Sequence, residues 1–125
     1  MTTTRGRAFF DEHMKYIGAG DVKGMVNNTY AENAILYNAF PCIDEPPPNV
    51  IKGREALINL FEIYLAYQGE IEVDNLYNFL ETEDVISFQA VITSSKTGKW
   101  AVADTWLMDK DFKQIVRHFG VAHKL

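Results

Sequence analysis

The change of hydrophobic period near Gly69 is the feature that most constrains how this chain can fold. Before it, apolar residues recur every three or four positions in three separate stretches, which is typical of amphipathic helices. After it, apolar and polar residues alternate over runs long enough to form strands. Helices followed by successive strands predict an α+β domain, with the helices packed on a sheet.

The first half of the chain predicts three helices. The first has apolar positions at i, i+3, i+4 and i+7 and ends near Gly18 or Gly20; these positions are Phe10, His13, Met14 and Ile17. Asp21 is the expected N-cap of a second helix over 22–30. The third helix opens at Gly53-Arg54-Glu55 and stops at Gly69.

One short strand is expected early, at 34–38, and four more follow the third helix. The expected ranges of these later strands are 71–80, 85–95, 100–108 and 114–122, with a hairpin turn at 96–99. The segment 39–49 contains three successive prolines and is predicted to be a loop. Such a loop either covers a binding site or is an uninvolved excursion on the surface.

Composition limits the classes of protein to consider. A chain of 125 residues that is 47% hydrophobic predicts a single domain over 1–125 with a sizeable core. Its formal charge of -5 and its scattered basic residues argue against nucleic acid or an anionic membrane as partner. No apolar run has the length of a spanning helix or a signal-peptide core, so we expect a cytoplasmic protein. The single cysteine, Cys42, allows no internal disulfide or cysteine-cluster metal site and is interpreted as a loop thiol.

Asp104 is the residue in the expected strand 100–108 that most strongly suggests chemistry. Alternation places it on the same strand face as four large or apolar side chains, namely Trp100, Val102, Trp106 and Met108. An ionised carboxylate buried without a partner is costly, so Asp104 should be hydrogen-bonded, paired or neutral. Acids in such surroundings are candidates for catalysis, although structural pairing produces them as well.

Three local motifs, in this order and spacing, resemble the NTF2-like superfamily and its SnoaL-like and ketosteroid-isomerase-like branch. The motifs are Gly20-Asp21 leading into Tyr30-Ala31-Glu32-Asn33-Ala34, then Lys52-Gly53-Arg54-Glu55-Ala56, and finally Asp104 with Ile115-Val116-Arg117-His118-Phe119. The resemblance implies a cone in which three N-terminal helices pack on a curved, mostly antiparallel sheet that encloses an apolar pocket. The superfamily includes isomerases, dehydratases and cyclases as well as binding and assembly domains, so the fold alone does not decide the function.

The resemblance also implies roles for individual residues. His13 lies where ketosteroid isomerases place the tyrosine that donates to the substrate oxyanion. Asp104 lies where those enzymes have a protonated, hydrogen-bond-donating aspartate and where SnoaL-type cyclases carry an acid/base aspartate. Asn38 replaces the isomerase general base, and an amide cannot accept a proton at neutral pH, which argues against steroid isomerisation by that route.

We therefore predict a cofactor-independent and metal-free enzyme that moves protons on a small hydrophobic carbonyl compound, by isomerisation, cyclisation or dehydration. His13 and Asp104 are the predicted catalytic pair, provided that the imidazole faces the carboxylate. The residues predicted to bind the ligand are Tyr37, Asn38, Tyr64, Phe88, Trp100, Trp106 and His118. A buried pair that only fixes the first helix on the sheet is the alternative for His13 and Asp104.

Two points stay open in the sequence. His118 shares a strand face with Val116 and Gly120, and that face lines either the pocket or a dimer surface. The alternatives to an enzyme are a non-catalytic domain that binds an apolar ligand and an assembly module that uses the outer face of its sheet. A homodimer is expected from the resemblance.

Overall fold

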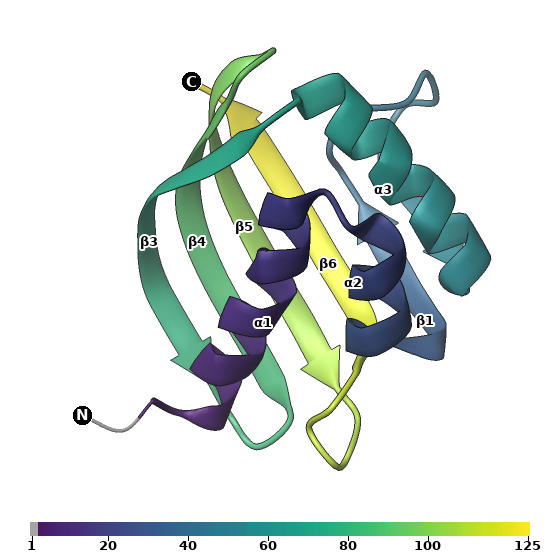
Figure 1. Ribbon diagram of the computed structural model, residues 1–125, viewed down its shortest axis with the longest axis vertical. Coiled ribbons are helices and arrows are strands. Elements are labelled where there is room, and N and C mark those ends of the chain that lie inside the picture. Colours follow the sequence, from purple (N-terminus) through teal and green to yellow (C-terminus); the bar gives the residue numbers. More distant parts are fainter. Residues whose placement is uncertain (1–2) are drawn as a thin grey trace.

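The computed structural model describes residues 3–125 and contains three helices and six strands (Figure 1). The helices are α1 (Arg5–Ala19), α2 (Val22–Thr29) and α3 (Arg54–Gln68). The strands are β1 (Tyr30–Asn38), β2 (Asn49–Lys52), β3 (Ile71–Glu81), β4 (Val85–Ser94), β5 (Gly98–Met108) and β6 (Ile115–Lys124). The predicted α+β class is confirmed.

The three predicted helices begin and end close to the expected residues, because capping groups set their limits. The Thr4 side chain accepts a hydrogen bond from the Arg7 amide at the start of α1, and Gly20 ends this helix in the left-handed region, with φ of 69°. Asp21 caps α2 as predicted, since its Oδ1 accepts from the Gly24 amide at 2.9 Å.

The strands form one sheet in the order β2-β1-β6-β5-β4-β3. The predicted meander from β3 to β6 is confirmed, and every neighbouring pair of strands is antiparallel except β1 with β6. Two predictions were incomplete. The early strand begins at Tyr30, directly after α2, and the short edge strand β2 was missed. Four residues that follow a proline-rich segment are too few to show a clear alternation.

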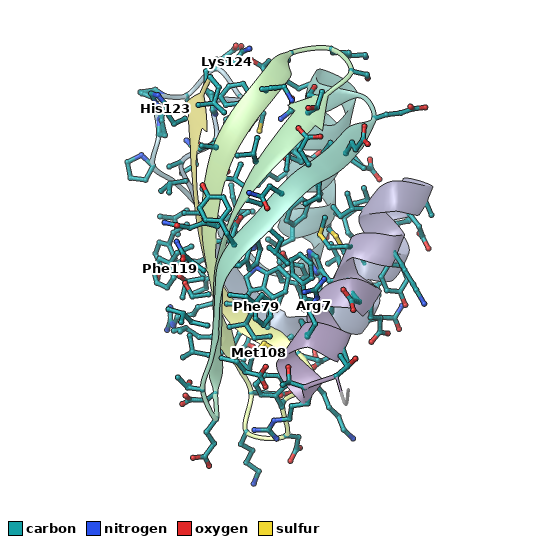
Figure 2. The ribbon with its side chains drawn as sticks, turned by 90° about the vertical axis from the view of Figure 1, so that its left-hand side faces the viewer. Arg7, Phe79, Met108, Phe119, His123 and Lys124 are labelled. Atoms are coloured by element: carbon teal, nitrogen blue, oxygen red, sulfur yellow. The ribbon has the colours of Figure 1, made fainter. Side chains whose placement is uncertain are left out.

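All three helices lie on the same face of the curved sheet, which bends around them (Figure 1). The main core lies between these two layers, where Trp106 of β5, 1% exposed, packs against Phe9 and Phe10 of α1. Figure 2 shows Phe79 and Met108 on the helix side of the sheet and Phe119 on the opposite side. No helix within residues 3–125 is long and apolar enough to cross a membrane.

Candidate functional site

A cavity of about 130 Å³ lies between the concave face of the sheet and helices α1 and α3. Its apolar wall includes Phe10, Met14 and Ile17 of α1, Leu60 and Phe61 of α3, and Phe88, Ala90, Ile92, Val102 and Trp106 of the sheet. Polar groups reach the cavity at only a few positions: His13, Asn38, Tyr64, Asp104 and His118. This composition, mostly apolar with a few convergent polar groups, is typical of a small-molecule site.

Asp104 is held at the wall of this cavity by His118 on the neighbouring strand. The two strands are antiparallel, and the His118 Nε2 atom lies 2.7 Å from Asp104 Oδ1. On its other side, His118 Nδ1 lies 2.8 Å from the hydroxyl of Tyr30, the first residue of β1. Asp104, His118 and Tyr30 therefore form a continuous hydrogen-bonded chain that connects β5, β6 and β1.

The direction of the hydrogen bonds in this chain follows from the chemistry of its ends. Burial, and secondarily the negative charge of Asp104, raises the pKa of Tyr30 well above its ordinary value, so the phenol keeps its proton. The carboxylate can only accept, so the Nε2–H of His118 donates to Asp104, and the protonated phenol of Tyr30 faces Nδ1. The second carboxylate oxygen, Asp104 Oδ2, has no hydrogen-bond partner within residues 3–125.

Gly120 makes the contact between His118 and Asp104 possible. It is the residue directly opposite Asp104 on β6, and a Cβ atom at this position would lie 2.8 Å from Asp104 Oδ1. Real Cβ atoms essentially never approach a heavy atom so closely. The absence of a side chain at Gly120 therefore leaves the space in which the carboxylate meets the imidazole.

His13 does not pair with Asp104, contrary to the sequence-based hypothesis. Its Nδ1 atom lies 3.1 Å from the hydroxyl oxygen of Thr29 on α2, and its ring packs on Trp106 with centroids 4.5 Å apart. Burial, followed by the nearby His118, lowers the pKa of His13 to about 3. The imidazole is therefore neutral at physiological pH and is a weak base, although it does line the cavity.

Asn38 also lines the cavity, but its amide is engaged in holding the loop that follows β1. Its Nδ2 donates to the Phe40 carbonyl at 2.9 Å and to Asn49 Oδ1 at 3.2 Å, while its Oδ1 accepts from the Phe40 amide. Both amide hydrogens are used, so the predicted hydrogen bond to a ligand carbonyl would require breaking one of these contacts. The loop itself contributes Phe40 and Cys42 to the cavity wall.

Tyr64 on α3 is the main side-chain donor left for a ligand. Burial raises the pKa of its phenol; the nearby Gln68 side chain offsets this in part, and the charge of Asp104 adds to it. The phenol is therefore protonated at neutral pH. Burial also raises the pKa of the Cys42 thiol, which makes it a poor nucleophile.

The structure separates the other predicted ligand-binding residues. Phe88, Trp106 and His118 line the cavity together with Tyr64 and Asn38. Tyr37 lies on the outer face of the sheet, where it stacks on Phe119 with ring centroids 4.7 Å apart and accepts a hydrogen bond from Arg117. The reason is alternation: neighbours on a strand point to opposite faces, so Tyr37 and Asn38 cannot both face inward.

Trp100 is the second predicted ligand residue that lies outside the cavity wall. It packs in a separate apolar cluster with Phe40, Ala90 and Ile92, and its indole N–H donates to Thr97 Oγ1 at 2.8 Å. Trp100 and Trp106 share a strand face, but six residues of strand separate them by about 20 Å. Two residues on the same strand face therefore do not have to belong to the same site.

Sequence reasoning missed three residues that shape the site: Tyr30, Thr29 and Gly120. The alternation of side chains along β1 could have identified Tyr30, because it is an even number of residues from the inward-facing Leu36 and Asn38 and so faces the same side. Thr29 and Gly120 act through their contacts with His13 and Asp104, which depend on how distant elements pack. Within residues 3–125, no group of three His, Cys, Asp or Glu side chains is arranged to hold a metal ion.

Comparison with solved structures identifies the fold. Wild-type IdmH from Streptomyces antibioticus, a proposed polyketide cyclase, matches with a TM-score of 0.74 at 14% identity, over 95% of this chain and 92% of IdmH. An NTF2-like protein from Anabaena variabilis matches with a TM-score of 0.73 at 15% identity, over 98% and 95% of the two chains. A SnoaL-like protein from Shewanella putrefaciens, also a proposed polyketide cyclase, matches with a TM-score of 0.71 at 10% identity, over 96% and 80%.

These matches concern structure only. No protein-family model matches the sequence, and no curated protein matches it either. At 10–15% identity, the likeness to solved structures establishes a common fold, whereas activity depends on the individual site. The chain has the NTF2-like α+β cone fold that its sequence motifs predicted.

Proposed function

We propose that the cavity binds a small hydrophobic carbonyl compound and that Asp104 moves a proton at the carbon beside the carbonyl, without a cofactor. The observation that carries this proposal is the Asp104 carboxylate at the wall of an apolar cavity. One of its oxygens is bound to His118, and the other has no hydrogen-bond partner in the described part of the chain. A carboxylate oriented in water-poor surroundings is suited to accept a proton from carbon.

The proton transfer can be written with residues of this site alone. Asp104 Oδ2 takes the proton from the α-carbon, and the C–H electron pair moves toward the carbonyl oxygen to form an enolate. The Tyr64 phenol donates a hydrogen bond to that oxygen. Return of the proton to another carbon gives isomerisation. Attack of the enolate carbon on a second carbonyl of the ligand, whose oxygen then takes the proton from Asp104, gives cyclisation. Departure of a β-hydroxyl as water, with the same proton, gives dehydration.

His118 and Tyr30 act as positioning residues in this proposal. The Nε2–H of His118 holds Asp104 Oδ1 at 2.7 Å and directs the other oxygen toward the ligand, while Tyr30 fixes the imidazole from behind. His118 thereby occupies the position beside the Asp104 carboxylate in which the sequence-based hypothesis placed His13. The catalytic roles of His13 and Asp104 stay predictions.

A non-catalytic ligand-binding domain is the second candidate function. Two observations favour it. Asn38 has no basic group, and its amide is hydrogen-bonded to the loop. His13 has a pKa of about 3 and is therefore too weak a base to act at neutral pH. The cavity would then hold an apolar molecule by burial alone. The two functions differ in one measurable respect, which is proton exchange at carbon.

An assembly role is the third candidate, and it concerns the opposite face of the sheet. Phe119 is 41% exposed there and stacks on Tyr37, on the side away from the helices (Figure 2). Exposed aromatic side chains on a sheet are typical of interaction surfaces. We propose that this face pairs with a second copy of the chain.

Exchange of α-protons for solvent deuterium tests the catalytic proposal without knowledge of the natural substrate. Cyclohexanone in D₂O is the probe, and proton NMR follows the loss of its α-proton signals with the wild type and with Asp104→Asn. We expect exchange above the buffer rate with the wild type and a loss of about 100-fold or more in the variant, as for removal of a general base.

Asp11→Asn is the matched control, since this carboxylate is exposed and pairs only with Arg7 on the surface of α1. It should exchange cyclohexanone like the wild type. A wild type that binds cyclohexanone but exchanges none of its protons would contradict the catalytic proposal and favour the binding domain.

A further inference from the structure

We propose that the pocket recognises an apolar ligand that carries a hydroxyl group, and that this hydroxyl donates a hydrogen bond to Nε2 of His13. The inference deepens the proposed function, because it names a chemical class for the ligand of the same pocket. It rests on the hydrogen bonds that fix the tautomer of His13, and it requires no particular reaction.

The hydroxyl of Thr29 determines which nitrogen of His13 carries the proton. Thr29 Oγ1 lies 2.6 Å from the Met25 carbonyl, which can only accept, so the single hydroxyl hydrogen of Thr29 is used there. Toward His13 Nδ1, at 3.1 Å, the same oxygen must accept. The donor in that contact is therefore Nδ1–H of His13.

A neutral imidazole has one N–H, so His13 Nε2 is left as a bare lone pair. His13 is neutral because burial lowers its pKa to about 3. The ring lines the cavity, and Nε2 has no hydrogen-bond partner within residues 3–125. A ligand therefore meets His13 as a hydrogen-bond acceptor.

The remaining polar groups of the cavity point to the same class of ligand. The hydrogens of Tyr30 and His118 are used in their own chain, and both amide hydrogens of Asn38 are used in the loop. Asp104 Oδ2 and His13 Nε2 are thus free acceptors, while the unpartnered donors of the cavity wall, within residues 3–125, are the Tyr64 phenol and the indole N–H of Trp106. A ligand with a hydroxyl donor satisfies this wall better than one with acceptors alone.

This reverses the role that the sequence resemblance implied for His13, which was donation to an oxyanion. An enolate oxygen placed against Nε2 would face a lone pair instead of a proton. We therefore expect a ligand with two different polar groups, a carbonyl oxygen that accepts from Tyr64 and a hydroxyl group that donates to His13.

Two small probes of nearly equal shape test the inference, p-cresol and p-xylene, which differ by a hydroxyl in place of a methyl group. Their single ring suits a cavity close in volume to those known to hold benzene. Titration calorimetry should show p-cresol binding about fivefold more tightly than p-xylene, the ratio that one net hydrogen bond provides. Equal affinities would contradict the proposal.

His13→Phe removes the acceptor but keeps a flat ring in the wall. In this variant p-cresol and p-xylene should bind with about equal affinity. An unchanged affinity for p-xylene shows that the pocket is intact. Asp11→Asn, which changes an exposed carboxylate of α1 outside the pocket, should keep the preference. If the preference instead survived His13→Phe and vanished in Asp104→Asn, the acceptor would be Asp104 and the inference would be wrong.

The tautomer can be read directly, independently of any ligand. In a protein labelled with ¹⁵N histidine, long-range NMR correlations should assign the proton of His13 to Nδ1. Thr29→Val should release this preference and Thr29→Ser should restore it. A proton found on Nε2 in the wild type would overturn the proposal, whereas failure of cyclohexanone exchange would affect only the proposed catalysis.

Discussion

At the scale of single residues, two histidines in one pocket receive different properties from their neighbours. His13 contacts a hydroxyl whose own hydrogen is donated elsewhere, so that this oxygen accepts from the imidazole, and an aromatic ring packs against it. His118 lies between a carboxylate on one side and a phenol on the other. The first is a neutral acceptor, and the second orients an anion. Residue type alone therefore does not determine what a histidine contributes to a site.

The low pKa of His13 predicts a dependence of stability on pH. The unfolded chain binds a proton at this histidine near pH 6.5, whereas the folded chain does so only near pH 3. The contribution of His13 to the free energy of unfolding is therefore fully present above pH 6.5 and is lost as the pH falls toward 3. The free energy of unfolding, measured with urea, should be about 2 kcal/mol lower at pH 5 than at pH 7 because of His13.

His13→Phe serves as the control for this measurement, since every other ionisable side chain is the same in both proteins. The variant should lose about 2 kcal/mol less than the wild type between pH 7 and pH 5. Identical losses in the two proteins would mean that His13 titrates normally in the folded state.

Gly120 supports a second prediction at this scale. Gly120→Ala places a methyl group 2.8 Å from Asp104 Oδ1, which is closer than such atoms approach, so the carboxylate must shift from its position beside His118. Cyclohexanone exchange should fall at least tenfold while the circular dichroism spectrum stays native. Gly18→Ala, whose new methyl group meets nothing within 4 Å, should leave exchange unchanged, and an unaffected Gly120→Ala would argue against the role of the Asp104–His118 contact.

At the scale of elements, the end of β1 joins the sheet to the loop that forms part of the cavity wall. Asn38 bonds both Phe40 at the start of this loop and Asn49 at its end. The loop is therefore anchored at both ends on one side chain. Its position over the cavity depends on an amide, which explains why a carboxylate is unsuited to this position here.

Asn38→Asp tests this interpretation, because it restores the residue type of the isomerase base. The new carboxylate donates nothing to the Phe40 carbonyl and to Asn49 Oδ1, so we expect destabilisation of about 2 kcal/mol. Urea denaturation measures the change, with the exposed Asn33→Asp as control. A variant as stable as the wild type would show that these hydrogen bonds do not hold the loop.

At the scale of the whole molecule, the sheet has two faces with separate proposed uses. Its concave face forms the cavity with α1 and α3. Its outer face carries Phe119 (Figure 2), which stacks on Tyr37. Because alternate residues of β5 and β6 serve the two faces, the chemistry of the pocket and the surface for assembly can change independently.

Phe119→Glu tests the proposed pairing of outer faces. A second copy would place its own charge against the first, and burial of unpaired carboxylates is costly, so the variant should be a monomer. Light scattering after gel filtration should give a dimer mass for the wild type and half of it for the variant. Cyclohexanone exchange and p-cresol binding provide the control that the cavity is unchanged, and a monomeric wild type would contradict the pairing.

Local rules were enough to predict much of this molecule from its sequence. Helical spacing and caps such as Asp21 located the three helices, and alternation located the meander and placed Asp104 among apolar residues. The order of these elements, together with short motifs, predicted the fold. These properties depend on residues within a few positions of one another, which a sequence displays directly.

Only the tertiary structure decided which polar side chains meet. Asp104 contacts His118 because β6 lies beside β5, and His118 contacts Tyr30 because β1 runs parallel to β6, an arrangement that no local pattern determines. His13 was excluded from that chain by Thr29, which lies 16 positions away. Hydrogen bonds reach about 3 Å, so partners separated by many residues are set by packing and not by spacing.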